Sequence, residues 1–195
     1  REASGEYIAF LDSDDWWKPK KLSLSLDPLN AGADIVYHDL FLVIKSDQQI
    51  FWKTTHCRNL KRPFFDDLLA NANTLPNSSV VVRKKCLAEI GGIAEGPDLI
   101  GCEDYDAWLR IAQRTKNFKY IPSTLGYYWV GGGNVSNPQR TLNNIEVIEA
   151  RFAEEINKLY QNNNVWWLNY VRGRAHYILG SFGISKLYLK AIVFG

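Results

Sequence analysis

The sequence has no methionine, few cysteines and no apolar run of the roughly 18 residues that a membrane-spanning helix needs. Without a starting Met, Arg1 is not a native beginning, so we expect the chain to be cut from a longer protein. Cys57, Cys86 and Cys102 are odd in number and lack metal-binding spacing, which favours reduced thiols in a cytoplasmic protein. With 23 basic and 21 acidic residues, the charge gives no reason to expect a nucleic-acid partner.

The composition predicts a folded α/β domain. Apolar residues make up 46% of the 195 positions, enough for one packed core. Apolar runs and helical patterns alternate along the chain, which is typical of a sheet covered by helices. We expect strands at 7–11, 34–44, 50–54, 79–83, 119–122 and 124–130, and helices at 20–29, 64–72, 84–90 and from 103. Beyond about residue 141 only helices are expected, so we divide the chain into 1–140 and a helical segment, 141–195.

The most informative stretch is YIAFLDSDDWW, residues 7–17. Its apolar first half predicts a strand buried on both faces. Asp12, Asp14 and Asp15 follow the strand, at the sheet edge where α/β proteins bind ligands. Three neighbouring carboxylates repel one another unless a cation offsets their charge, and oxygen ligands suit Mg²⁺ or Mn²⁺. The alternative is an acidic turn that only caps the next helix.

A second acidic group opens the amphipathic helix EDYDAWLRIA. Glu103 and Asp104 occupy its first turn, with Asp106 close behind. A carboxylate there is stabilised by the helix dipole and by free backbone N–H groups, so we expect Asp104 to be ionised at neutral pH and able to accept a proton. Acidic first turns are also ordinary in helices, and taken alone this pattern favours the structural interpretation.

Three segments, taken in order, resemble family 2 glycosyltransferases of the GT-A fold. GEYIAFLDSDDWWKPKKL resembles the family's metal-binding signature. SSVVVRKKCLAEIGGIAEG followed by EDYDAWLRIA resembles its later segment, in which a Gly-Gly turn precedes the catalytic base. YYWVGGGNVS resembles the aromatic strand and Asn/Ser loop that follow. The resemblance implies a GT-A (nucleotide-diphospho-sugar transferase, Rossmann-like) mixed sheet flanked by helices, here without the family's first strands.

This resemblance implies an inverting, metal-dependent transfer of a sugar from a nucleoside-diphosphate sugar, such as a UDP-sugar, to an acceptor hydroxyl. Asp14 would be the direct ligand of Mg²⁺ or Mn²⁺. Asp12 would lie near the donor ribose or the metal, with Asp15 supporting. Asp104 would be the general base, and Glu103 its substitute or an acceptor-binding group. The product would belong to cell-surface polysaccharide or glycan biosynthesis.

The acceptor side is implied with less detail. Trp16, Trp129, Asn134 and Ser136 are the candidate acceptor-binding residues, although Trp129 stands where many family members have Arg. The missing first strands form the family's nucleotide-base pocket, so we expect this chain alone to be inactive. Two alternatives stay open: a non-catalytic binding or scaffolding remnant of a transferase fold, or a sugar nucleotidyltransferase.

The helical tail, 165–194, combines aromatic residues, basic residues and a Gly-Ser-Phe-Gly break between two apolar-striped helices. Its apolar stripes predict that it docks on the rest of the chain or rests on a membrane surface as a peripheral contact. The sequence leaves this choice, and the oligomeric state, open.

Overall fold

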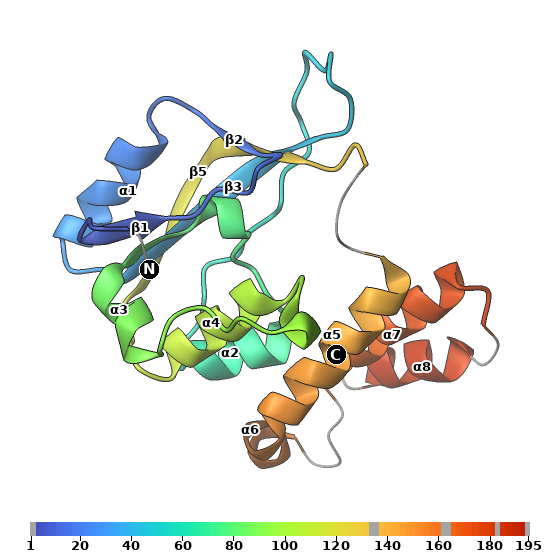
Figure 1. Cartoon of the computed structure of the whole chain (residues 1–195). Helices are drawn as coiled ribbons and strands as arrows, with labels where there is room; N and C mark the ends of the chain where they lie inside the picture. Colours follow the sequence, from blue (N-terminus) through green and yellow to red (C-terminus); the bar gives the residue numbers. More distant parts are fainter. Residues whose placement is uncertain (1–2, 133–136, 161–164, 182–183, 194–195) are drawn as a thin grey trace.

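The protein is described by a computed structural model that covers residues 3–132, 137–160, 165–181 and 184–193. Its framework is a mixed five-stranded sheet (Figure 1). The strands lie in the order β1 (Tyr7–Ala9), β4 (Val81–Arg83), β3 (Ile35–Val43), β5 (Phe118–Trp129) and β2 (Trp16–Trp17). Only β3 and β5 run parallel; the other neighbours are antiparallel. The predicted α/β class is therefore confirmed.

Strands β3 and β5 form the spine of the sheet. The residue partner of β3 on β5 moves from Ile121 opposite His38 to Thr124 opposite Asp39, a register shift in the β5 strand. Pro122 lies inside this bulge, where its missing N–H costs no ladder hydrogen bond. The two strands expected at 119–122 and 124–130 are consequently one continuous strand.

Helices cover both faces of the sheet (Figure 1). Helix α1 (Lys21–Asn30) packs on one face, where Leu29 joins a small cluster with Val36 and Val81. The other face carries the main core, with α2 (Phe64–Asn71) and α4 (Glu103–Ala112). Short elements connect them: η1 (Asn77–Ser79), α3 (Lys84–Glu89) and η2 (Pro97–Leu99).

The α1 face also buries a lysine. Lys21 is 0% exposed, and its Nζ lies 3.9 Å from the centre of the Trp17 ring. Within the described residues, neither Lys21 Nζ nor His38 Nε2 has a hydrogen-bond partner. Burial lowers the pKa of Lys21 to about 7, because the charged ammonium loses its hydration.

After residue 137 the described part of the chain consists of helices joined by short turns and contains no strand, as expected. It forms α5 (Pro138–Arg151), α6 (Ala153–Leu159), α7 (Trp166–Ile178) and α8 (Ile184–Val193). Helices α5, α6 and α7 contribute residues to the main core, and Trp167 Nε1 donates to the Leu69 carbonyl at 2.9 Å. These helices dock on the rest of the chain, while α8 packs mainly on α7.

Two expectations about strands are wrong. The segment 50–54 forms no strand; Thr54 makes only an isolated bridge with Phe41. The first strand ends at Ala9 and is half-buried at the edge of the sheet rather than buried on both faces, and Leu11 is 47% exposed. Within the described ranges, every helix is too short or too polar to cross a bilayer.

Candidate active site

The first acidic group sits on a tight turn beyond β1. The Asp15 N–H donates to the Asp12 carbonyl at 3.1 Å, which closes the turn. The adjacent η1 segment holds Asp12 from the other side: the Asn77 amide donates to Asp12 Oδ1 at 2.7 Å, and the Asp12 N–H donates to Ser78 Oγ at 3.0 Å. Asp12 is therefore half-buried in a fixed position.

The other two aspartates of the turn differ sharply in environment. Asp14 is exposed, whereas Asp15 is buried and its Oδ1 accepts the Trp129 N–H at 2.9 Å. Burial raises the pKa of Asp15, the contacts of Ser78 and Trp129 oppose this, and repulsion from the other two aspartates adds to it. Asp15 thus faces the sheet, while Asp14 faces solvent.

Asp104 lies in the first turn of α4, as predicted, but its ionisation differs from the expectation. Burial raises the pKa of Asp104 to about 7; the Tyr105 N–H and the Asn73 amide lower it, and the charges of Glu103 and Asp12 raise it. The helix terminus stabilises the anion less than burial penalises it, so the carboxyl is not fully ionised at neutral pH. Such a group can both accept and release a proton near pH 7.

Glu103 has a more local role in the structure. Its Oε2 accepts the Gly101 N–H at 2.6 Å, so the side chain folds back over the start of α4. Gly101 has φ +90, a conformation that L side chains rarely adopt. Glu103 therefore stabilises the turn that positions Asp104.

Carboxylates of both acidic groups act on one tyrosine of β5, Tyr128. Burial raises the pKa of Tyr128, and the carboxylates of Asp15, Asp12, Asp14 and Asp104 raise it further. Residues far apart in the sequence, from the turn after β1 and from α4, therefore share one electrostatic environment. The only sequence signal for Tyr128 was its place in an aromatic strand, which is usually a sign of packing.

Asp106, by contrast, is a structural residue. It is 0% exposed and accepts from Arg110 Nε and Arg151 Nε, each at 2.7 Å. Arg110 belongs to α4 and Arg151 to α5. This double ion pair joins the two helices and separates Asp106 from the candidate site.

The aromatic acceptor candidates Trp16 and Trp129 lie in β2 and at the end of β5. Trp16 is 42% exposed and stacks on Tyr127, with ring centres 5.2 Å apart. Trp129 Nε1 donates to the Gly132 carbonyl at 3.0 Å. Asn134 and Ser136 lie outside the described residues. Trp16 therefore has the free ring surface that a sugar could contact, although it also packs.

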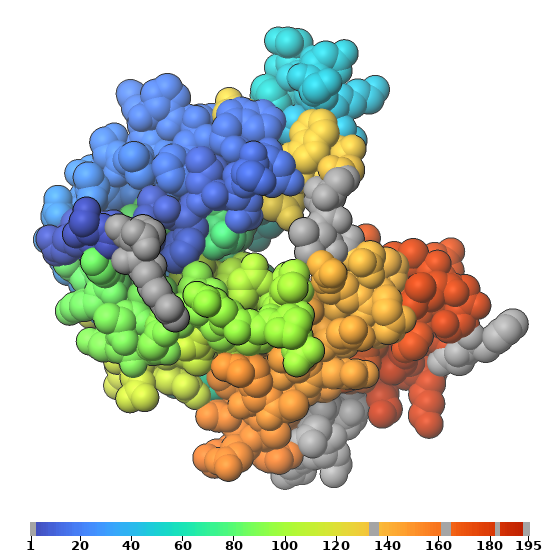
Figure 2. Space-filling model, in the orientation of Figure 1, coloured from blue at the N-terminus to red at the C-terminus, as the bar shows by residue number. Residues whose placement is uncertain are grey.

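A pocket of about 270 Å³ opens beside Asp104. Its lining comes from α4, α5, α7 and the segments just before α4 and after α2, and it includes Asn73, Asn144, Arg140 and Trp167. In the space-filling view the segment near residue 100 lies against the start of α5, and a hollow separates this segment from the blue N-terminal part of the chain (Figure 2). The carboxyl that can take a proton thus faces a space large enough for a small polar group, with polar and apolar walls.

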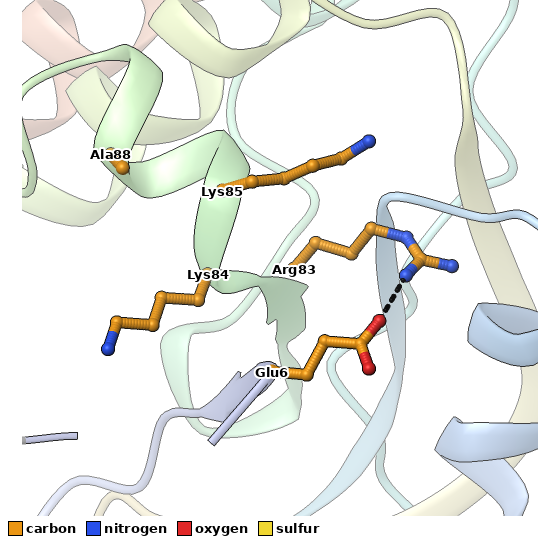
Figure 3. Close-up of a pocket in the computed structure, with 5 residues that line it drawn as sticks. All are labelled: Glu6, Arg83, Lys84, Lys85 and Ala88. Carbon is orange, nitrogen blue, oxygen red and sulfur yellow. Dashed lines mark hydrogen bonds and ion pairs between the residues drawn. The ribbon is translucent and has the colours of Figure 1, made fainter. Parts of the chain in front are cut away.

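A second pocket, of about 310 Å³, lies on the β1–β4 side (Figure 3). Its cations already have partners: Arg83 pairs with Glu6 at 2.8 Å, and Lys84 Nζ donates to the Ala3 carbonyl at 2.6 Å. Lys84 and Lys85 extend away from each other, so the pocket does not gather free positive charge.

Residues 1–172 match the sequence model of the family described as glycosyltransferase-like family 2. The chain belongs to this family. An uncharacterized glycosyltransferase from Nostoc sp. (strain PCC 7120) is 29% identical over 140 residues, which cover 68% of this chain and 42% of that protein. The crystal structure of S. aureus TarS 1-349 in complex with UDP-GlcNAc superimposes with a TM-score of 0.51 at 11% identity, which supports the GT-A fold. The chain spans 66% of that TarS chain.

The site offers two carboxylates for a metal ion instead of the three that the sequence predicted. Across the described residues, no three His, Cys, Asp or Glu side chains gather so that they could hold a metal by themselves, so convergence of Asp12, Asp14 and Asp15 on one cation is not confirmed. None of the ion pairs among the described residues involves the carboxylates that act on Tyr128, which are those of Asp12, Asp14, Asp15 and Asp104. Two carboxylates completed by substrate phosphates are a usual Mg²⁺ arrangement, and Asp12 and Asp14 suit it.

Proposed function

We propose that the full-length protein transfers a sugar, with inversion, from a nucleoside-diphosphate sugar to a hydroxyl of a glycan or lipid-linked acceptor. The observation that carries this proposal is the shared environment of Asp12, Asp14 and Asp104 around Tyr128 in a family 2 chain. Attack of an acceptor hydroxyl on the anomeric carbon while the diphosphate leaves needs a donor-phosphate site and a proton acceptor in one site.

Asp12 and Asp14 would hold Mg²⁺ or Mn²⁺, which when bound supplies positive charge for the departing diphosphate. Asp12 is suited to this because Asn77 and Ser78 already fix its position. Asp14 is suited because it is exposed and can reach a ligand outside the chain. Asp15 faces the sheet, so we assign it to positioning of the turn and leave it out of the ligand set.

Asp104 would take the proton from the acceptor hydroxyl. Its pKa of about 7 matches that task, because a general base is most effective when its pKa lies near the working pH. Attack by that hydroxyl from the face opposite the diphosphate gives inversion. The Asn73 amide, which donates to Asp104 Oδ2 at 3.3 Å, would hold the carboxyl in position, and Glu103 would brace the turn.

The pocket beside Asp104 would receive the acceptor. Arg140 and Asn144 offer hydrogen-bond donors on the α5 wall, and the Trp167 ring offers an apolar surface. Trp16, in β2 next to the acidic turn, would contact a sugar face. TarS was crystallised with UDP-GlcNAc, which supports a UDP-sugar as the donor. We place the activity on the cytoplasmic side, in the synthesis of a cell-surface polysaccharide or glycan.

The decisive experiment measures UDP release from a panel of UDP-sugars by the full-length protein with Mn²⁺ and candidate glycan acceptors. Asp104→Asn should lower turnover about 100-fold or more with donor affinity nearly unchanged. Asp98→Asn is the matched control, since Asp98 is an exposed carboxylate in the neighbouring η2 segment.

Two results would overturn the proposal. Full turnover by Asp104→Asn would show that Asp104 is not the general base, and Glu103→Gln is then the variant to examine. Nucleotide-sugar binding without any turnover would favour a non-catalytic scaffold, whereas formation of UDP-sugar from sugar phosphate and UTP would favour a nucleotidyltransferase.

A further inference from the structure

The α7–α8 hairpin carries an apolar surface that the described residues do not cover. On α8, Leu189 and Ile192 are 60% and 76% exposed. On α7, Tyr177 and Ile178 are 69% and 60% exposed. Two exposed apolar side chains on each helix of one hairpin make it a candidate contact surface. We call this set, Tyr177, Ile178, Leu189 and Ile192, the hairpin surface.

The inner side of α8 is already used, so the hairpin surface is not simply a mispacked core. Gly173 of α7 lets α8 approach closely: a Cβ there would lie 3.4 Å from Leu187 Cβ and from Tyr188 Cζ. Tyr188 also meets the Tyr170 ring edge-on, with ring centres 5.9 Å apart. Leu189 and Ile192 are not part of this contact and are exposed, and Tyr177 and Ile178 are exposed in the last turn of α7.

Positive charge accompanies the hairpin surface. Residues 165–193 contain no Asp or Glu. Arg172 pairs with Glu149 of α5, which neutralises it, but Arg174, Lys186 and Lys190 are exposed and take part in none of the ion pairs of the described residues. By helical spacing, Lys186 and Lys190 flank Leu189, and Arg174 lies one turn from Tyr177 and Ile178.

The geometry points to a negatively charged lipid surface as the partner of this hairpin. Apolar and aromatic side chains bordered by cations match the boundary between acyl chains and anionic headgroups. A second copy of the same face is a poor partner, because its cations would oppose these cations with no acid between them. Because α7 also supplies Trp167 to the pocket beside Asp104, docking would hold that pocket near the membrane.

The test is co-sedimentation of the full-length protein with vesicles of phosphatidylcholine alone and of phosphatidylcholine with 30% phosphatidylglycerol. We expect binding to the anionic vesicles only, weakened by 0.5 M salt. Leu189→Glu/Ile192→Glu and Lys186→Glu/Lys190→Glu should each lower the partition coefficient at least about tenfold. Circular dichroism should be unchanged, because the four side chains are exposed; Leu189→Ser/Ile192→Ser replaces the first pair if it misfolds.

Matched controls separate the hairpin from other exposed residues. Ile50→Glu changes a side chain with the same 76% exposure as Ile192, on a different loop, and Lys45→Glu/Lys119→Glu removes two exposed cations elsewhere. These variants should bind like the parent. Equal binding to neutral vesicles, no binding, or unchanged binding of the hairpin variants overturns the inference. The readout is lipid binding, so it is independent of the proposed transfer activity.

Discussion

The carboxylate of Asp15 accepts a hydrogen bond from the Trp129 N–H at 2.9 Å, across 114 positions of sequence. This contact fastens the acidic turn to the end of β5, beside β2. It gives Asp15 a different task from its neighbours, since a side chain committed to the sheet is poorly placed to bind an ion in solvent. The difference between Asp14 and Asp15 can be measured.

Asp14→Asn should weaken Mn²⁺ binding in the presence of UDP on the order of 100-fold, whereas Asp15→Asn should weaken it about tenfold at most. The reason is that the first change removes a ligand and the second alters only the support of the turn. Titration calorimetry on the full-length protein, with MnCl₂ and UDP, measures both. Equal losses in the two variants would return Asp15 to the ligand set.

The rate of transfer should depend on pH through Asp104. With a pKa of about 7, this base is increasingly protonated as pH falls, so kcat/KM should decrease tenfold per pH unit well below pH 7. This decrease of kcat/KM below pH 7 should disappear in Asp104→Asn and persist in Asp98→Asn. A flat profile between pH 5 and 8 for the parent protein would contradict the assignment.

The Asp104 carboxyl should also lower the free energy of unfolding when it is ionised. Its pKa is raised on folding, from 3.8 to about 7, so the folded state holds the proton more tightly and stability falls as pH rises through this window. Asp104→Asn should therefore raise the free energy of unfolding by about 2 kcal/mol at pH 8 and by little near pH 4. Urea unfolding at both pH values checks this; a pH-independent difference would mean that the carboxyl is not the cause.

Lys21 should behave in the opposite sense. Its pKa is lowered from 10.5 to about 7, so the unfolded chain binds the proton more tightly and stability rises as pH increases from 7 towards 10.5. Lys21→Met should stabilise the protein by about 2 kcal/mol at pH 6, with a gain that shrinks as pH rises. Unfolding curves of both proteins at pH 6 and 9.5 test this. Destabilisation at pH 6 would show that the Trp17 ring compensates the buried cation.

The elements of the fold follow local patterns closely enough to be read from sequence. The turn after β1, the start of α4 and the glycines after α3 all occur where expected; Gly91 and Gly92 take φ 75 and φ 87. The segment 50–54 misled because its apolar residues suit a strand, but a strand also needs a neighbour to pair with. Here the pairing with β3 is limited to the Phe41–Thr54 bridge and the backbone hydrogen bonds beside it, and the sequence pattern does not reveal that the pairing stops there.

The site was harder to predict for a different reason. Three aspartates in four positions look equivalent in the sequence, and the partner that distinguishes Asp15 lies at Trp129. The pKa of Asp104 depends first on burial, then on Tyr105 and Glu103 of its own helix, and also on Asp12 and Asn73, which lie far away in the sequence. Sequence therefore indicates which residue types gather, while long-range packing decides their protonation and direction.

Asp106 couples the candidate base to the wall opposite it. Through Arg110 and Arg151 it fixes α4 and α5 at a set separation, and α5 carries Arg140 and Asn144 of the pocket. The pocket therefore has the width that one buried carboxylate allows. Attempts to widen its acceptor range would start at Arg151, outside the lining, because loosening that joint moves an entire helix while each lining residue changes only its own contact.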